Sequence, residues 1–153
     1  MTTRPIHIAM AFLQWKEWPV QRTEDPNTII STFAGHNGQW NLYAIQHPER
    51  EQLAFYSLFP HRFGKDAVAA LLEFTARINA GIIMGNFEVL LEHGEVRFKT
   101  SIDLTDQTLN LKYCNPLVYY NLLAMDNHFK ALEHIVCNNG SCQEAMALLA
   151  KDE

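Results

Sequence analysis

Six apolar residues in the C-terminal third of the chain recur at alternating intervals of four and three residues. They are Val118, Leu122, Met125, Phe129, Leu132 and Val136. Because an α-helix has 3.6 residues per turn, this spacing predicts one long helix with a single apolar stripe that packs against another surface. Asn115-Pro116 is typical of a helix start, and Asn138-Asn139-Gly140 is typical of a helix end. The rest of the chain must therefore supply a surface that covers this stripe.

Three segments in the first half of the chain predict β-strands, because each is rich in β-branched and aromatic residues. They span residues 28–35, 39–46 and 52–59. Asn37-Gly38 is typical of a two-residue type I′ turn between the first two strands, and a polar loop precedes the third. These segments predict a three-stranded antiparallel meander.

The middle strand of this meander has no cleanly polar face. Trp40 and Ala44 point to one side and Tyr43 and Ile45 to the other, since side chains alternate along a strand. Part of the outer face is therefore expected to be covered.

A second hairpin is predicted over residues 87–103, where apolar and charged residues alternate and His93-Gly94 forms a two-residue turn. Apolar residues three and four apart indicate helices at residues 5–15 and 68–80. Residues 17–27 are expected to hold at most a short edge strand.

Ser141-Cys142-Gln143-Glu144 has the spacing of a capping box and predicts a short last helix that ends near Ala150. The predicted order is thus α-β-β-β-α-β-β-α followed by this helix. Such an order gives an α+β fold.

Composition narrows the class of protein. The chain has 153 residues, 48% of them hydrophobic and 19% charged, which predicts one globular domain over residues 1–153. A formal net charge of −5 argues against a nucleic-acid partner. No apolar run is long enough to span a membrane and no signal peptide precedes the fold, so a soluble cytoplasmic protein is expected. The odd number of cysteines predicts reduced thiols.

Several short motifs are familiar. Gly38-Gln39-Trp40 follows the first turn, Asn79-Ala80-Gly81 ends the second helix, and Gly85-Asn86-Phe87-Glu88 and His93-Gly94-Glu95-Val96-Arg97-Phe98 build the second hairpin. This pattern resembles the YbjN family of bacterial proteins, labelled sensory transduction regulators, from the first helix to the end of the long one. His93 stands where an Asp is common, so no role of an acidic residue carries over to that turn.

The resemblance implies a fold like that of type III secretion chaperones, which has the same order of elements. That fold is a curved antiparallel sheet of about five strands with helices mainly on one face. The family has no established catalytic residues, so the resemblance implies no enzyme activity and no cofactor. The resemblance does not identify a partner for this protein.

Two groups of residues could carry chemistry. His134, Cys137 and Cys142 have part of the spacing of a zinc site, but the ligand set is incomplete and buried free cysteines are the favoured interpretation. His61, Arg62 and Lys65 precede the second helix, whose free N–H groups could receive an anion, but no P-loop is present. Neither group predicts a catalytic or a metal site.

The aromatic residues of the meander are the favoured binding site. Trp40, Tyr43 and Tyr56 are the candidate residues for a partner or a ligand. The leading hypothesis is a noncatalytic protein-interaction or chaperone-like regulatory domain that holds a protein segment. The alternatives are a small-molecule sensor with an aromatic-lined pocket and an unrecognised hydrolase or metal enzyme.

A homodimer is also expected. The long helix, the two shorter helices and the outer face of the meander each carry apolar residues, and a single sheet face is not expected to bury them all. Two-fold self-association would cover the remainder.

Overall fold

The computed structural model describes residues 3–151, which form four α-helices and one six-stranded antiparallel sheet. The helices are α1 (Pro5–Trp15), α2 (Val68–Asn79), α3 (Leu111–Asn138) and α4 (Cys142–Ala150). The strands are β1 (Gln21–Arg22), β2 (Thr28–Ala34), β3 (Gln39–His47), β4 (Gln52–Leu58), β5 (Asn86–Leu90) and β6 (Glu95–Asp103). Among these described residues no helix is both long and apolar enough to cross a bilayer.

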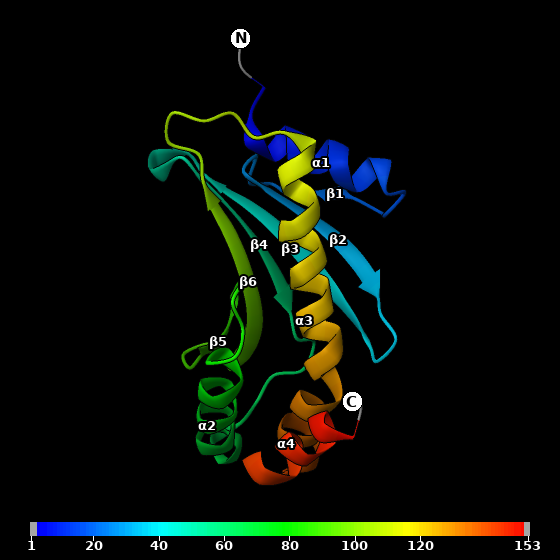
Figure 1. The fold of residues 1–153 in the computed structure, drawn as a ribbon, viewed down its shortest axis with the longest axis vertical. Helices are drawn as coiled ribbons and strands as arrows, with labels where there is room; N and C mark the ends of the chain where they lie inside the picture. Colours follow the sequence, from blue (N-terminus) through cyan, green and yellow to red (C-terminus); the bar gives the residue numbers. More distant parts are fainter. Residues whose placement is uncertain (1–2, 152–153) are drawn as a thin grey trace.

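The strand order in the sheet is β1-β2-β3-β4-β6-β5. The meander β2-β3-β4 is therefore continued by β6, and β5 forms the edge. Figure 1 shows the curved sheet with α3 running along its front, α1 at the upper end, and α2 and α4 at the lower end. The α+β class and the order of elements predicted from the sequence are confirmed, with the two-residue β1 as a sixth strand.

One face of the sheet carries the helices. α1 lies against β2 and β3, α3 lies against β4 and β6, and α2 lies beside β5. The apolar stripes of all three helices are buried there, including Phe12 of α1, Phe74 of α2 and Met125 of α3. The apolar stripes of the three helices are therefore buried together, whereas the opposite face of the meander has no helix over it.

α3 begins earlier than the sequence indicated. Asn110 is the N-cap, and its side-chain oxygen accepts a hydrogen bond from the backbone N–H of Lys112 at 2.9 Å. Pro116 lies inside the helix rather than at its first position. The prediction of a start at Asn115-Pro116 was wrong because Asn110 offers the same capping chemistry one and a half turns earlier, and because a proline near a helix start removes only one backbone hydrogen bond.

The two hairpin turns also differ from the prediction. Neither Asn37 nor Gly38 has a positive φ, so the β2–β3 turn is not type I′. Four residues connect the strands, and the N–H of Gly35 donates to the carbonyl of Gly38 at 2.8 Å. The β5–β6 turn likewise has four residues, of which only Gly94 has a positive φ.

The β2–β3 turn takes its shape from α3. A Cβ on Gly38 would lie 2.3 Å from the ring of Phe129. The glycine is therefore required by the close approach of the helix, a contact that lies 91 positions away in sequence and cannot be read from the turn itself.

Candidate interaction surface

The sheet face opposite the helices is the first candidate surface. Alternate residues of each strand point to it, and cross-strand pairing brings Ile30, Tyr43, Tyr56 and Lys99 into one row. Ile30 and Tyr43 are half-buried, and Tyr56 is 9% exposed. In Figure 1 the helices lie on the near side of this sheet, and none of the described helices covers the row. We call these four residues the sheet row.

A charged cluster borders the sheet row. The guanidinium of Arg97 lies over the ring of Tyr56, with 4.2 Å from Cζ to the ring centre. Glu88 pairs with Arg97 Nε at 2.8 Å and with Lys99 Nζ at 3.1 Å. Two cations share one carboxylate, so this edge of the face has an excess positive charge that can attract an acidic group.

An open hollow of about 330 Å³ adjoins Tyr56 on the same face. Its lining is mainly polar, and includes Gln52, Lys99 and Asp103. Tyr43 and Trp40 do not line it. The described residues therefore form no enclosed pocket from the three candidate aromatic residues, as the sensor hypothesis would require.

The structure separates Trp40 from the two tyrosines. Trp40 is 2% exposed on the helix-covered face, where its Nε1–H donates to Ser57 Oγ at 2.9 Å and its ring stacks on Phe129. Tyr43 and Tyr56 are direct cross-strand neighbours on the open face. Only the tyrosines, therefore, can contribute to a surface there.

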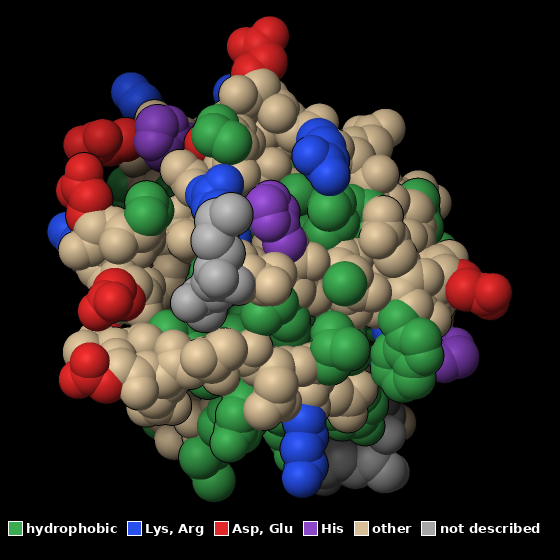
Figure 2. All heavy atoms as spheres, turned by 90° about the horizontal axis from the view of Figure 1, so that it is seen from above, with side chains coloured by type: hydrophobic (Ala, Val, Ile, Leu, Met, Phe, Trp, Pro, Cys, Tyr) green, Lys and Arg blue, Asp and Glu red, His purple; other side chains and the backbone are tan. Residues whose placement is uncertain are grey.

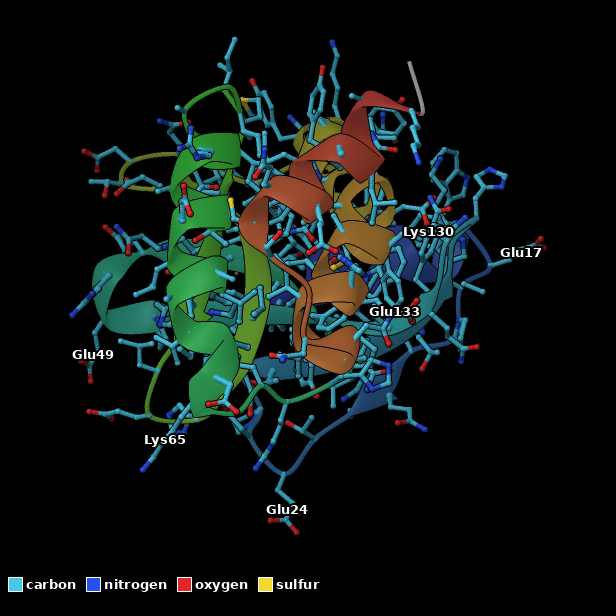
Figure 3. The ribbon with its side chains drawn as sticks, turned by 90° about the horizontal axis from the view of Figure 1, so that it is seen from below. Glu17, Glu24, Glu49, Lys65, Lys130 and Glu133 are labelled. Carbon is cyan, nitrogen blue, oxygen red and sulfur yellow. The ribbon has the colours of Figure 1, made fainter. Side chains whose placement is uncertain are left out.

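The side chains of His61, Arg62 and Lys65 before α2 do not converge on one point. The ring of His61 packs edge-on against Phe59, and Arg62 Nη2 lies 3.5 Å from Glu95 Oε1. Lys65 lies in a short 3₁₀ helix, and its side chain extends away from the molecule (Figure 3). Arg62 therefore has a carboxylate beside it and the three side chains point in different directions, and anion binding by these residues stays a prediction.

The three cysteines and His134 were the candidate metal ligands, and the structure shows their surroundings. All three cysteines are free, and His134 Nε2 lies 2.9 Å from Glu144 Oε2 at the junction of α3 and α4. Burial raises the pKa of Cys114 to about 11. Among residues 3–151 no three His, Cys, Asp or Glu side chains cluster in a way that could hold a metal ion.

A second candidate surface, which the sequence analysis missed, lies on the outer side of α3. Tyr113, Tyr119, Tyr120 and Leu123 are 50%, 56%, 44% and 38% exposed. Figure 2 looks down on the end of the molecule where α1 and the start of α3 lie, and hydrophobic side chains gather on its lower half. The sequence does carry a signal for this surface, because these apolar residues fall outside the buried stripe of the helix.

The motifs that suggested a family resemblance have clear structural roles. Asn79 Oδ1 accepts the N–H of Phe87 at 2.7 Å, and Asn79 Nδ2 donates to the carbonyl of Phe87 at 3.0 Å. This side chain pairs with the outer edge of β5 as a neighbouring strand would. Gly85 has φ +86°, and a Cβ there would lie 2.5 Å from the carbonyl of Lys99. These residues shape the second hairpin and are not part of a binding site.

Comparisons with known proteins agree with this architecture. Residues 10–134 match the model of a family described as "YbjN: Putative bacterial sensory transduction regulator". The crystal structure of YbjN from E. coli is similar, with a TM-score of 0.57 and 8% sequence identity over 77% of this chain and 83% of that chain. A HopA1-SchA chaperone-effector complex gives a TM-score of 0.49 and 18% identity over 78% of this chain and 88% of that chain. No curated protein gave a match. The family match covers most of the chain and the fold agrees with it, so this protein belongs to the YbjN family.

Proposed function

We propose that this protein is a noncatalytic interaction module that holds a segment of another protein on the open face of its sheet. The observation that carries this proposal is the sheet row, in which Ile30, Tyr43 and Tyr56 lie side by side with no helix over them. Half-buried apolar side chains such as Ile30 and Tyr43 on a sheet face without a helix offer a surface that a partner can cover. The family description names a regulator, and this role needs no catalytic step.

The chemistry of the face indicates what kind of segment it holds. Tyrosine rings offer apolar area with little side-chain entropy to lose, and their hydroxyl groups can remain hydrated or pair with the partner. Arg97 and Lys99 at the border share only Glu88, so a segment with apolar side chains and a nearby carboxylate fits best. The three free thiols support a cytoplasmic site of action.

Site-specific photo-cross-linking tests this proposal. A photoreactive phenylalanine at position 43 should capture a defined protein from native lysate, and a second substitution, Ile30→Ser, should weaken that capture. The matched control places the same group at Thr32, which is exposed on the same face but outside the sheet row. Equal capture from positions 43 and 32, or capture unaffected by Ile30→Ser, would contradict the proposal.

The small-molecule sensor has no support from the hollow beside Tyr56, which is open and mainly polar. The homodimer remains a prediction. One part of its original reason does not hold, because the three helices bury their apolar stripes together, but the outer face of the meander has no helix over it. Exposed apolar residues on α3 provide a different reason.

A further inference from the structure

The hollow beside Tyr56 is continuous with the sheet row, because Tyr56 and Lys99 belong to both. Its centre is the cross-strand pair of Ala54 in β4 with Ser101 in β6, whose side chains are short. Longer side chains form the neighbouring pairs on the same face, Gln52 with Asp103 and Tyr56 with Lys99. A short pair between two long pairs thus hollows the sheet face to about 330 Å³. This volume is at the lower end of the range for ligand sites and suits one side chain of a partner.

Arg50 brings to the hollow a positive charge that is not paired within the described part of the chain. It is the last residue of the short 3₁₀ helix Pro48–Arg50 between β3 and β4, and it lines the hollow. None of the ion pairs in residues 3–151 involves its guanidinium group. Its sequence neighbours Glu49 and Glu51 do not line the hollow, and the side chain of Glu49 extends away from the molecule in Figure 3.

The other charges around the hollow cancel one another. Lys99 and Arg97 share the carboxylate of Glu88 at one end. Asp103 adds a second carboxylate at the other end. Together with Arg50, three cations therefore face two carboxylates, which leaves one positive charge when histidines are counted as neutral.

One excess positive charge favours a carboxylate over a phosphate as the bound group. A carboxylate carries one negative charge and neutralises the hollow, whereas a phosphate monoester carries about −1.5 to −2 at neutral pH and leaves it negative. Guanidinium and ammonium groups both form charge-assisted hydrogen bonds with carboxylate oxygens. Tyr56 and Ser101 in the lining carry hydroxyl groups that can donate to the same oxygens.

The open shape of the hollow favours a carboxylate that belongs to a longer chain. Arg50 is exposed and the side chain of Lys99 is 31% exposed, so water screens the attraction of both for a free anion. A carboxylate attached to a segment that already lies on the sheet row is present at a high effective concentration, and weak contacts then become sufficient. Its binding therefore depends on the apolar contacts at Ile30 and Tyr43.

The register of the sheet sets the distance between the two parts of such a segment. Tyr43 pairs with Tyr56, and the pair of Ala54 with Ser101 lies two residues further along the strands. With strands about 4.8 Å apart and about 6.8 Å between alternate residues, the hollow lies on the order of 10 Å from Tyr43. An extended chain spans this distance in about three residues. An acidic residue about two to four positions from an apolar residue therefore fits both places.

We propose that the hollow between β4 and β6 is a specificity site that receives an aspartate or glutamate side chain of the segment held on the sheet row. This inference rests on the proposed function, because it names a feature of the partner that the same sheet face holds. Arg50 and Lys99 select the carboxylate, and the sheet row supplies the apolar contacts.

Peptide display on the whole protein tests the charge of the site. From a library of random peptides, wild type should enrich those with Asp or Glu about two to four positions from an apolar residue. Arg50→Glu leaves two cations against three carboxylates, so it should replace this preference with one for Lys or Arg. Lys65→Glu makes the same change in net charge at an exposed lysine that does not line the hollow, and it should select the same peptides as wild type.

Binding constants of one selected peptide then separate the contributions. Replacement of its acidic residue by the corresponding amide should weaken binding to wild type about threefold to tenfold, because charge-assisted contacts at a partly exposed site are lost. The same replacement should have little effect on binding to the double variant Arg50→Gln/Lys99→Gln. Phosphoserine at that position should bind less tightly than the acidic residue, and tighter binding would overturn the assignment to a carboxylate.

Two further results would overturn the inference: peptides selected by wild type without an acidic preference, or an acidic preference that Arg50→Glu leaves intact. The proposed function fails by a different result, because it requires enrichment of apolar residues and weaker binding of the selected peptide to Ile30→Ser. Apolar enrichment without an acidic preference would retain the sheet row as a binding surface and remove the role of the hollow.

Discussion

The carboxylate of Asp126 in α3 accepts a hydrogen bond from the backbone N–H of Asn37 in the β2–β3 turn, with 2.8 Å between Oδ1 and N. Its second oxygen accepts the N–H of His36 at 3.1 Å, and the Asn37 side-chain amide donates to the Asp126 carbonyl at 3.0 Å. One carboxylate that is 8% exposed therefore fixes the end of a hairpin to the middle of the long helix.

Asp126→Ala should lower the free energy of unfolding by about 2–3 kcal/mol, because hydrogen bonds to a charged group are lost and two N–H groups lose their acceptors. Urea denaturation measures this change. Glu24→Ala removes an exposed carboxylate and should have an effect near zero. If the two variants unfold at the same midpoint, the Asp126 contacts do not stabilise the fold.

Phe98→Ala should cost about 3–5 kcal/mol. Phe98 is fully buried in β6 and its ring centre lies 4.8 Å from that of Phe87. Ser101→Ala on the open face of the same strand is the control and should cost less than about 0.5 kcal/mol. An unchanged denaturation midpoint for Phe98→Ala would reject the assigned register of β6.

Asn79→Ala should expose the backbone of Phe87 at the edge of the sheet. We expect faster hydrogen exchange at the Phe87 amide and a loss of about 1–2 kcal/mol, since two hydrogen bonds to the strand disappear. Asn79→Asp keeps an acceptor for the Phe87 N–H but loses the donor, so it should protect that amide better than alanine does. Equal exchange in all three proteins would show that α2 alone protects β5.

His128 should make stability depend on pH. Burial lowers the pKa of His128 below its ordinary value of 6.5, and its ring packs edge-on against Phe87 while Nδ1 lies 2.7 Å from the carbonyl of Ala124. The unfolded chain therefore binds this proton more readily than the folded one, so the stabilising contribution is complete above about pH 6.5 and decreases as the pH falls below it. Comparison of unfolding free energies at pH 7.5 and 5.5 should show a smaller loss in His128→Phe than in wild type. A loss of the same size in both proteins would mean that other groups cause it.

The cysteines should differ in reactivity. Because burial raises the pKa of Cys114 to about 11 and Cys142 is 5% exposed, only the exposed Cys137 should react rapidly with a thiol reagent in the folded protein at neutral pH. Cys137→Ser should remove the fast phase, and denaturation should reveal the other two thiols. Near-stoichiometric zinc in elemental analysis of the purified protein would contradict the prediction that these thiols are unmetallated.

Element types and their order could be predicted from the sequence, because they depend on local spacing. The predicted stripe of α3 is buried from Val118 to Leu132, with Val136 partly buried, and the capping box at Ser141 is present. Left-handed Asn139 ends α3 where the sequence indicated an end. Alternation along β6 correctly placed Val96 and Phe98 in the core. Each of these features is decided by residues within a few positions of one another.

Contacts between residues that are distant in the sequence determined the shape of the β2–β3 turn and which faces are covered. Asn37-Gly38 looked like a type I′ turn by itself, but Asp126 and Phe129 of α3 impose another shape on it. Spacing placed Tyr43 and Trp40 on opposite faces of a strand, yet only the packed helices show which face is covered. The exposed Tyr113, Tyr120 and Leu123 of α3 are visible in the sequence as apolar residues outside the buried stripe, but they form a surface only because the sheet occupies the other side of the helix. A local pattern sets which side chains share a face, and tertiary packing alone determines which of those faces remains in contact with water.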